Sequence, residues 1–228
     1  MIIIKKLGIV IALLGTFVSA QAQEYKTREV PNAPAFSAVE VSGGDVNVYF
    51  SQGKGHSFSV SGPAKLVKAI KIKVKESTLF IEYKEPFFTG DDDVAVYVNA
   101  PQLNRVAVYG EADFESKTAF QGTELVIKTR QNGEVSMKQV NVAQINIDSK
   151  GSSSVDLDYV EANHIRISAL DRAEVELSGT TERFEVLKKG MFAEIDTKKL
   201  VATQTDSSAS GVAGQVAKDG SVEFSFNE

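Results

Sequence analysis

The sequence predicts an all-β fold: a parallel β-helix, or solenoid, with coils of about 20 residues, preceded by an N-terminal β-sheet or hairpin cap. Three segments align without gaps and at equal spacing, LVIKTRQNGEVSM from Leu125, INIDSKGSSSVDL from Ile145 and IRISALDRAEVEL from Ile165. Apolar residues recur at the same offsets in each segment, so equivalent side chains are expected to stack inside the solenoid. Helix content should be low, because apolar residues are nowhere spaced three and four apart over a full helix.

A third apolar strip supports this period and gives each coil a further inward corner. It consists of Phe120, Val140, Val160, Thr180 and Leu200. Less regular copies flank the repeats at a slightly shorter spacing: Val106 and Val108 are expected beside Leu125 and Ile127, and Phe184 and Val186 beside Ile165 and Ile167. Val201 and Thr203 are expected to begin a last coil. An antiparallel sandwich is the rival fold, but it gives no reason for a gapless repeat.

Polar segments separate the two strands of each repeat and are expected to form its corners. They are residues 130–134, 150–154 and 170–174, rich in the Gly, Asn, Asp and Ser that tolerate tight turns. Gly151-Ser152-Ser153-Ser154 is therefore interpreted as a turn and not as a phosphate-binding or nucleophile loop. Replacing Ser153 with Ala at such a corner is expected to be nearly silent.

The N-terminal half shows strands without a fixed period. Alternating apolar residues predict strands around Val39, Val46 to Phe50, Phe58 to Val60, Ile70 to Val74, Leu79 to Ile81 and Val94 to Val98. Gly43-Gly44-Asp45 predicts a hairpin turn between the first two strands, and Pro63 to Ala69 a single helical turn. Residues 36–100 would then cap the solenoid of residues 101–228 or form a separate small sheet, and 36–228 would be one continuous domain. Val222 to Phe226 is expected to be the last strand.

The N-terminus has the organisation of a cleavable signal peptide over residues 1–22. Lys5 and Lys6 supply positive charge, residues 7–18 are apolar, and Ala20-Gln21-Ala22 matches a cleavage site. A retained signal anchor is the weaker alternative, because the apolar run is shorter than the roughly 20 residues a bilayer requires. Residues 23–35, with Pro31 and Pro34, are expected to be a linker or an edge-strand lead-in. The mature chain should lack a membrane span and be exported to the periplasm, the cell surface or the medium.

The chain resembles the head GIN domain family of putative auto-transporter adhesins. The resemblance lies in FSAVEVSGGDVNVYF from Phe36, in PQLNRVAVYG from Pro101, and in the turns at residues 110–112, 133–135 and 151–153. It extends from about Phe36 to Phe226. It implies an exported bacterial protein of a kind common in Bacteroidetes, with a β-helix fold similar to pectin lyases but without their catalytic residues, and a role in adhesion.

The composition offers little for catalysis. The chain has no Cys and only two His, His56 and His164, each expected to be a surface residue. No catalytic residue, metal ligand or cofactor is therefore predicted. Asp91, Asp92 and Asp93 could ligate Ca²⁺, but their spacing fits a solvated loop better than a known calcium loop. Outward carboxylates are expected at Glu134, Asp156, Asp158, Glu174, Glu176, Glu194 and Asp196, on a solvated sheet face.

These observations leave three hypotheses for function. The first is a non-catalytic exported interaction module, in cell adhesion or surface binding. The second is a periplasmic structural or sensory protein that binds an envelope partner, and the third a polysaccharide-active β-helix enzyme, supported only by analogy of fold. The partner would be an unknown glycan or an envelope or cell-surface protein. Nucleic acid is not expected, because the formal net charge is -5.

Overall fold

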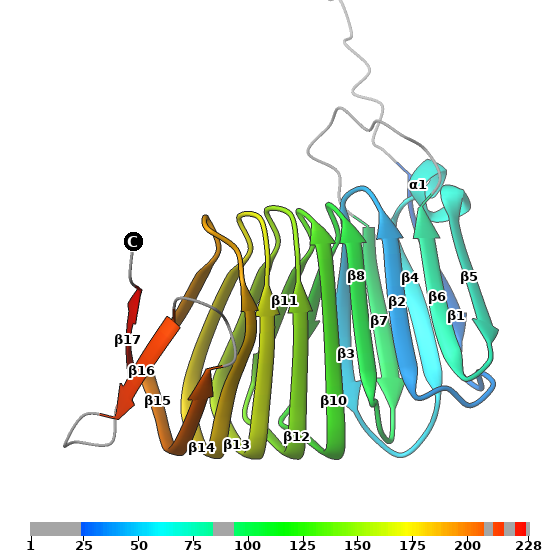
Figure 1. Cartoon of the computed structure of the whole chain (residues 1–228). Helices are drawn as coiled ribbons and strands as arrows, with labels where there is room; N and C mark the ends of the chain where they lie inside the picture. Colours follow the sequence, from blue (N-terminus) through cyan, green and yellow to red (C-terminus); the bar gives the residue numbers. More distant parts are fainter. Residues whose placement is uncertain (1–23, 84–93, 208–211, 217–221, 227–228) are drawn as a thin grey trace, which may run out of the picture.

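The computed structural model describes residues 24–83, 94–207, 212–216 and 222–226. Within them, strands β1 to β15 form one 15-stranded sheet that is wound into a β-solenoid, and β16 and β17 form a separate antiparallel pair. Figure 1 shows the coils stacked along one axis, with α1 and β5 at one end and β16 and β17 at the other. The predicted signal peptide and Asp91 to Asp93 lie outside the described residues.

The elements are short at the N-terminal end and longer in the repeats. The first group is β1 (Tyr25–Val30), β2 (Ala38–Gly43), β3 (Val46–Gln52), β4 (Ser57–Pro63), α1 (Ala64–Ala69), β5 (Ile70–Lys75), β6 (Thr78–Tyr83), β7 (Val94–Ala100), β8 (Arg105–Gly110) and β9 (Asp113–Ser116). The second group is β10 (Phe120–Gln131), β11 (Glu134–Lys138), β12 (Val140–Ser149), β13 (Ser154–Ala169), β14 (Glu174–Lys189), β15 (Glu194–Ser207), β16 (Val212–Val216) and β17 (Val222–Phe226).

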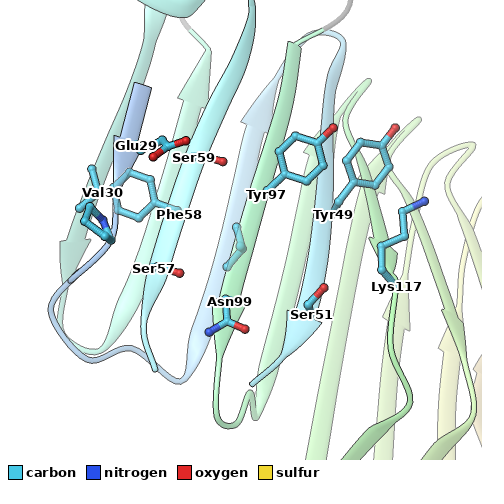
Figure 2. Close-up of a pocket in the computed structure, with 12 residues that line it drawn as sticks. Glu29, Val30, Tyr49, Ser51, Ser57, Phe58, Ser59, Tyr97, Asn99 and Lys117 are labelled. Carbon is cyan, nitrogen blue, oxygen red and sulfur yellow. The ribbon is translucent and has the colours of Figure 1, made fainter. Parts of the chain in front are cut away.

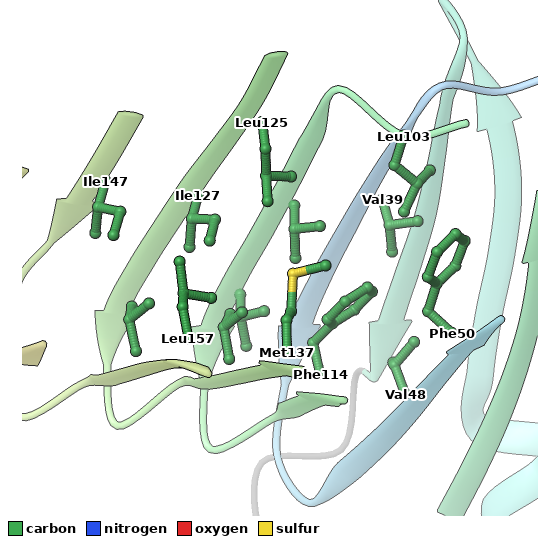
Figure 3. Close-up of a cluster of buried hydrophobic side chains, with 14 of the residues drawn as sticks. Val39, Val48, Phe50, Leu103, Phe114, Leu125, Ile127, Met137, Ile147 and Leu157 are labelled. Carbon is green, nitrogen blue, oxygen red and sulfur yellow. The ribbon is translucent and has the colours of Figure 1, made fainter. Parts of the chain in front are cut away.

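Neighbouring parallel strands pair at the residue spacing of the predicted repeat. Leu125 pairs with Ile145 and Ile145 with Ile165, and Val135 lies beside Val155 in the neighbouring strand. All of these side chains are fully buried. Figure 3 shows that such residues from successive coils project into one common interior. β-Branched and aliphatic side chains pack well in this setting, because each rests on a similar side chain one strand away.

Two details of the predicted register are wrong, and both lie where the period changes. Val106 pairs with Ile127, not Leu125, because the coil between β8 and β10 is longer than expected. In the third strip Leu200 lies beside Gly179, while Thr180 is exposed. The cause is a register shift between β13 and β14 after Leu157. The prediction that Phe184 lies beside Ile165 is confirmed.

The first corner of four successive coils is a stack of residues with positive φ. Gly110, Gln131, Gly151 and Asp171 occupy it in successive coils, with φ of 93°, 62°, 88° and 62°. Glycine adopts this conformation without a steric penalty, and Asp tolerates it better than most residues. The Gly133-Glu134-Val135 turn is not equivalent to Gly110-Glu111-Ala112, because Gln131 pairs with Gly110.

Ser153 is not a solvent-facing corner residue, which corrects the expectation for this position. It is 1% exposed. Its hydroxyl donates to the Lys150 carbonyl at 2.9 Å, and it lies 3.0 Å from Thr129 Oγ1 and 2.9 Å from Ser149 Oγ. The three hydroxyls thus satisfy one another inside the solenoid, as buried polar groups require. Ala173 and Ala193 are the buried residues at the same corner of the next two coils.

The N-terminal strands join the same solenoid, but not in chain order. β2 lies between β6 and β8, and β3 between β7 and β9, all in parallel register. Gly43-Gly44-Asp45 therefore turns a corner of a coil, and the hairpin predicted there is wrong. The actual hairpin joins β5 and β6 through Glu76 and Ser77, both with positive φ as a tight hairpin turn requires.

Antiparallel strands complete the N-terminal end. β4 pairs antiparallel with β7, and β1 pairs antiparallel with β4, so the residues before Ala35 include an edge strand. α1 is the predicted single helical turn, and it buries Leu66 and Val67. In the described residues, no helix is long and apolar enough to cross a membrane. The outermost parallel strands, β7 and β6, are thus each paired with an antiparallel strand, β4 and β5.

Candidate functional site

One outer face of the solenoid carries a continuous row of side chains that crosses nine strands. Each member pairs in register with the next: Glu29, Ser59, Tyr97, Tyr49, Glu115, Ser136, Asp156, Glu176 and Asp196. We call this the outer row. Between Glu29 and Glu115 the outer row consists of a serine and two tyrosines, whereas beyond Ser136 all of its members are carboxylates.

The outer face is hollowed over β4 and β7. The hollow has a volume of about 300 Å³, and its lining includes Tyr97, Tyr49, Ser59, Asn99 and Lys117. Strand β4 presents small serine side chains here, whereas β7 and β3 present tyrosines. The hollow forms because this antiparallel strand places serines directly beside a large ring: Ser59 pairs with Tyr97. We call it the tyrosine hollow.

Two tyrosine rings form one wall of this hollow. The ring centroids of Tyr49 and Tyr97 lie 5.4 Å apart with their planes inclined by 35°, and half of Tyr97 is exposed to solvent. Figure 2 shows both rings projecting side by side from neighbouring strands, with Lys117 beyond Tyr49. Lys117 Nζ lies 4.3 Å from the centroid of the Tyr49 ring and pairs with Glu115. Tyr49 is therefore held between an aromatic ring and a cation.

The polar side of the hollow is held by hydrogen bonds to nearby loops. Asn99 Nδ2 donates to the carbonyl of Gly55 at 2.7 Å. A side chain on Gly53 would meet Asn99 Oδ1, since a Cβ there would lie 2.3 Å away. Gln52, at the end of β3, donates through Nε2 to Pro101 and Gln121 and accepts from the Gln121 N–H. The ends of β3 and β7 are thus fixed, which keeps the hollow in shape.

The rest of the outer face is acidic. Asp156, Asp158, Glu174, Glu176, Glu194 and Asp196 lie outward on it, as does Glu134, which agrees with the outward placement predicted for all seven. Partial burial raises the pKa of Asp156 above its ordinary value, and the nearby carboxylates of Asp158 and Glu176 raise that pKa further. Lys138 opposes part of this effect and Lys199 pairs with Glu176, but carboxylates outnumber lysines on this part of the face.

The two histidines lie away from this hollow. His56 Nε2 lies 3.0 Å from the Phe36 carbonyl oxygen, and its ring packs edge-on against the Phe36 ring. His164 Nε2 lies 3.3 Å from Glu185 Oε2, and Arg166 Nε lies 3.5 Å from the same oxygen. Both rings are partly buried in structural contacts, so neither is the simple surface residue that was expected. Among the described residues, no three His, Cys, Asp or Glu side chains are placed to hold a metal ion.

The tyrosine hollow was missed from sequence. Tyr49 and Tyr97 each follow the in–out alternation of their strands, so each was predictable as an outward residue. Their contact depends on the parallel pairing of β3 with β7, which are far apart in the sequence. The antiparallel pairing of β4 with β7 leaves no periodic signal in the sequence either. The sequence therefore did not predict that the serines and the tyrosines are neighbours.

Comparison with protein families places this chain in a known group. Residues 35–219 match the family model described as "Putative auto-transporter adhesin, head GIN domain". The match covers most of the chain and includes strands β2 to β16. No curated protein matches the sequence.

Solved structures with the same fold include three from Parabacteroides species. A putative adhesin from Parabacteroides distasonis aligns with a TM-score of 0.73 at 18% identity, over 82% of this chain and 78% of its own. A putative adhesin from Parabacteroides merdae gives a TM-score of 0.72 at 18% identity with the same coverage. A putative lipid binding protein from P. distasonis gives 0.65 at 18% identity, over 81% of this chain and 78% of its own. These similarities show the shared fold.

Proposed function

Because the chain belongs to the putative auto-transporter adhesin, head GIN domain family, we propose that it is a non-catalytic, exported interaction module that binds a glycan in the tyrosine hollow. The observation that carries this proposal is the Tyr49–Tyr97 wall, which together with serine and asparagine side chains lines a hollow of about 300 Å³. Concave sites with aromatic walls and a few placed polar groups are the usual form of small-ligand sites.

A sugar suits this lining better than the other ligand classes. The apolar face of a pyranose ring packs on an aromatic ring, while its hydroxyls need donors and acceptors such as Ser59, Asn99 and Glu29. An acyl chain would leave these polar groups without partners, which is costly. We therefore favour a glycan over a lipid, although one structural neighbour is described as a putative lipid binding protein.

The proposed export of the protein supports a partner outside the cytoplasm. The predicted signal peptide at residues 1–22 and the adhesin-like family both fit an exported or surface protein. A partner in the periplasm, such as an envelope protein, is the alternative occupant of the same face. The other alternative is a polysaccharide-active enzyme. The same experiment distinguishes an enzyme from a binding module, because only an enzyme would release products.

The experiment incubates the mature chain, from Gln23, with an array of bacterial and host glycans and records retention and released products together. Tyr97→Ala is the test variant and Tyr25→Ala the control, because Tyr25 is 66% exposed but does not line the hollow. We expect retention without product release. Tyr97→Ala should weaken it by roughly two- to tenfold, as expected for loss of one aromatic contact of about 0.5–1.5 kcal/mol.

Three results would contradict the proposal. Release of reducing or unsaturated ends would make the protein an enzyme. Equal retention by Tyr97→Ala and wild type would place the glycan site elsewhere. Retention of no glycan, together with stoichiometric co-purification of an envelope protein, would support the periplasmic alternative.

A further inference from the structure

The outer face has a second hollow on the other side of Tyr49. It has a volume of about 220 Å³ and is lined by Tyr49, Asn47, Glu115, Glu134 and Ser136, among others, from β3, β9 and β11. Tyr49 lines both hollows. The two hollows therefore follow one another across the strands, with the Tyr49 ring and the Lys117 side chain that packs on it between them.

The two hollows run along the axis of the solenoid. From β4 to β11 the strand order is β4, β7, β3, β9 and β11, and neighbouring strands lie about 4.8 Å apart, so the span is about 19 Å. Side chains along this line come from the outer row, one per strand. Because these residues pair in register, they lie at similar positions along their strands. A linear ligand with a repeating unit of similar length can contact an equivalent position at every strand.

The charges on the second hollow restrict what that ligand carries. Glu134 lines this hollow, and Asp113 lies beside Glu134 in the register of β9 and β11. The acidic part of the outer face begins at the next strand. Lys117, the nearby cation of the first hollow, already pairs with Glu115. A ligand with carboxylate or sulfate groups would meet like charge at each coil. Hydroxyl groups, in contrast, can donate to these carboxylates.

We infer that the two hollows form one extended site for a linear neutral glycan chain, which lies across the strands from β4 to β11. This inference rests on the proposed function and specifies its ligand: an oligosaccharide longer than a disaccharide, without acidic groups. Tyr97 and Tyr49 hold one end by ring contacts. The carboxylates and Ser136 hold the next units through hydroxyl groups.

A length series tests the extended site. The probes are cello-, manno- and N-acetylglucosamine oligomers of two and six units, titrated against the mature chain while its tyrosine fluorescence is recorded. The chain has six Tyr and no Trp, so the signal is not masked by indole emission. For the series that binds, the hexamer should bind at least about tenfold more tightly than the dimer. Equal affinity of dimer and hexamer would overturn the extended site.

A blocking substitution tests the position of the second hollow. Ser136→Tyr places a large side chain in it, and Ser168→Tyr makes the same change at an outward position on another face of the solenoid, beside Asp148. We expect Ser136→Tyr to reduce hexamer affinity to that of the dimer and to leave dimer affinity unchanged. Ser168→Tyr should change neither. Hexamer binding that is unaffected by Ser136→Tyr would contradict the inference.

Matched acidic probes test the charge preference, with hexamers of galacturonate and mannuronate in the same titration. They should bind at least about tenfold more weakly than the neutral hexamer. Tighter binding of uronates would overturn the inference while leaving glycan binding by the tyrosine hollow intact. Loss of all glycan binding would instead remove the proposed function, so the two failures are distinguishable.

Discussion

The two ends of this solenoid differ in how they are built. From Phe120 to Ser207 each coil follows the last in chain order, with parallel strands and a nearly constant register. Before Ser116 the chain starts at the edge strand β1, enters the stack with β2 and β3, turns back through antiparallel β4 and β5, and then places β6 and β7 outside β2 and β3. The tyrosine hollow lies in this irregular end. The interruption of the repeat places serines beside tyrosines on the outer face and makes that face concave there.

Burying a charge in either end is the most severe test of whether they share one core. Ile147→Asp and Ile167→Asp should each lower the free energy of unfolding by about 4 kcal/mol, because both side chains are buried between coils. Val48→Asp in the irregular end should cost a similar amount. Thermal unfolding measures the loss, with Thr123→Asp, at an exposed position, as the control.

Hydrogen exchange on Val48→Asp then asks whether the ends unfold together. A single 15-stranded sheet predicts that amides of β12 and β13 lose protection along with those of β3. Amides of the repeats that stay fully protected would show that residues 36–100 are a separate folding unit.

Replacing corner glycines with alanine tests how closely the backbones of neighbouring coils approach in the two ends. A Cβ on Gly110 would lie 2.1 Å from the Gly43 carbonyl oxygen, whereas one on Gly151 would lie 2.7 Å from that of Gln131. Gly110→Ala should therefore cost about 3 kcal/mol and Gly151→Ala about 1–2 kcal/mol. Denaturant unfolding measures both. Gly55→Ala, where a Cβ meets nothing within 4 Å, is the control.

Ser153→Ala examines the polar interior of the regular coils. The substitution removes hydrogen bonds to Lys150, Thr129 and Ser149, although the latter two still bond each other at 2.7 Å. The expected loss is about 1 kcal/mol, with no effect on binding in the tyrosine hollow. An unchanged midpoint of chemical unfolding would mean that these hydroxyls contribute nothing net to stability.

The smallest expected effect concerns pH and the acidic coils. The pKa of Asp156 is raised in the folded protein, so the folded state binds this proton more tightly than the unfolded state does. The free energy of unfolding should therefore fall as pH rises through the raised pKa, and the whole decrease should be present above that pKa. Asp156→Asn removes that penalty.

The variant should consequently be slightly more stable than wild type at pH 7 and equal to it at about pH 3, where the carboxyl is mostly protonated in the folded and the unfolded state. Thermal unfolding at the two pH values measures this, with Glu194→Gln on the same face as the control. A variant that is less stable than wild type at pH 7 would show that the Asp156 carboxylate contributes favourable contacts that outweigh its burial.

Much of the regular end was predictable from sequence, because side chains that stack inside the solenoid produce a regular spacing of apolar residues along the chain. The pairings of Leu125 with Ile145 and of Ile145 with Ile165 follow from that period alone. The errors lie where the period changes slightly, at Val106 and at Thr180, because a bulge or a longer coil leaves no apolar signal.

The irregular end was not predictable in the same way. Val39 pairs with both Leu79 and Val106, and these partners stand at unequal distances along the chain. Gly43-Gly44-Asp45 has the composition of a hairpin turn, but the same residues suit a solenoid corner, so local turn chemistry did not decide the pairing. The candidate site depends on these non-local pairings, so its residues could be predicted as outward but not as neighbours.

The most direct test is a crystal structure of the mature chain bound to the neutral hexasaccharide that it retains best. A sugar ring packed against Tyr97 and Tyr49, with the chain crossing the strands toward Ser136, is the predicted result. Sugar bound at the corners, along a single strand, or only over the acidic coils of β13 to β15 would contradict the assignment of the site to the interrupted end of the solenoid.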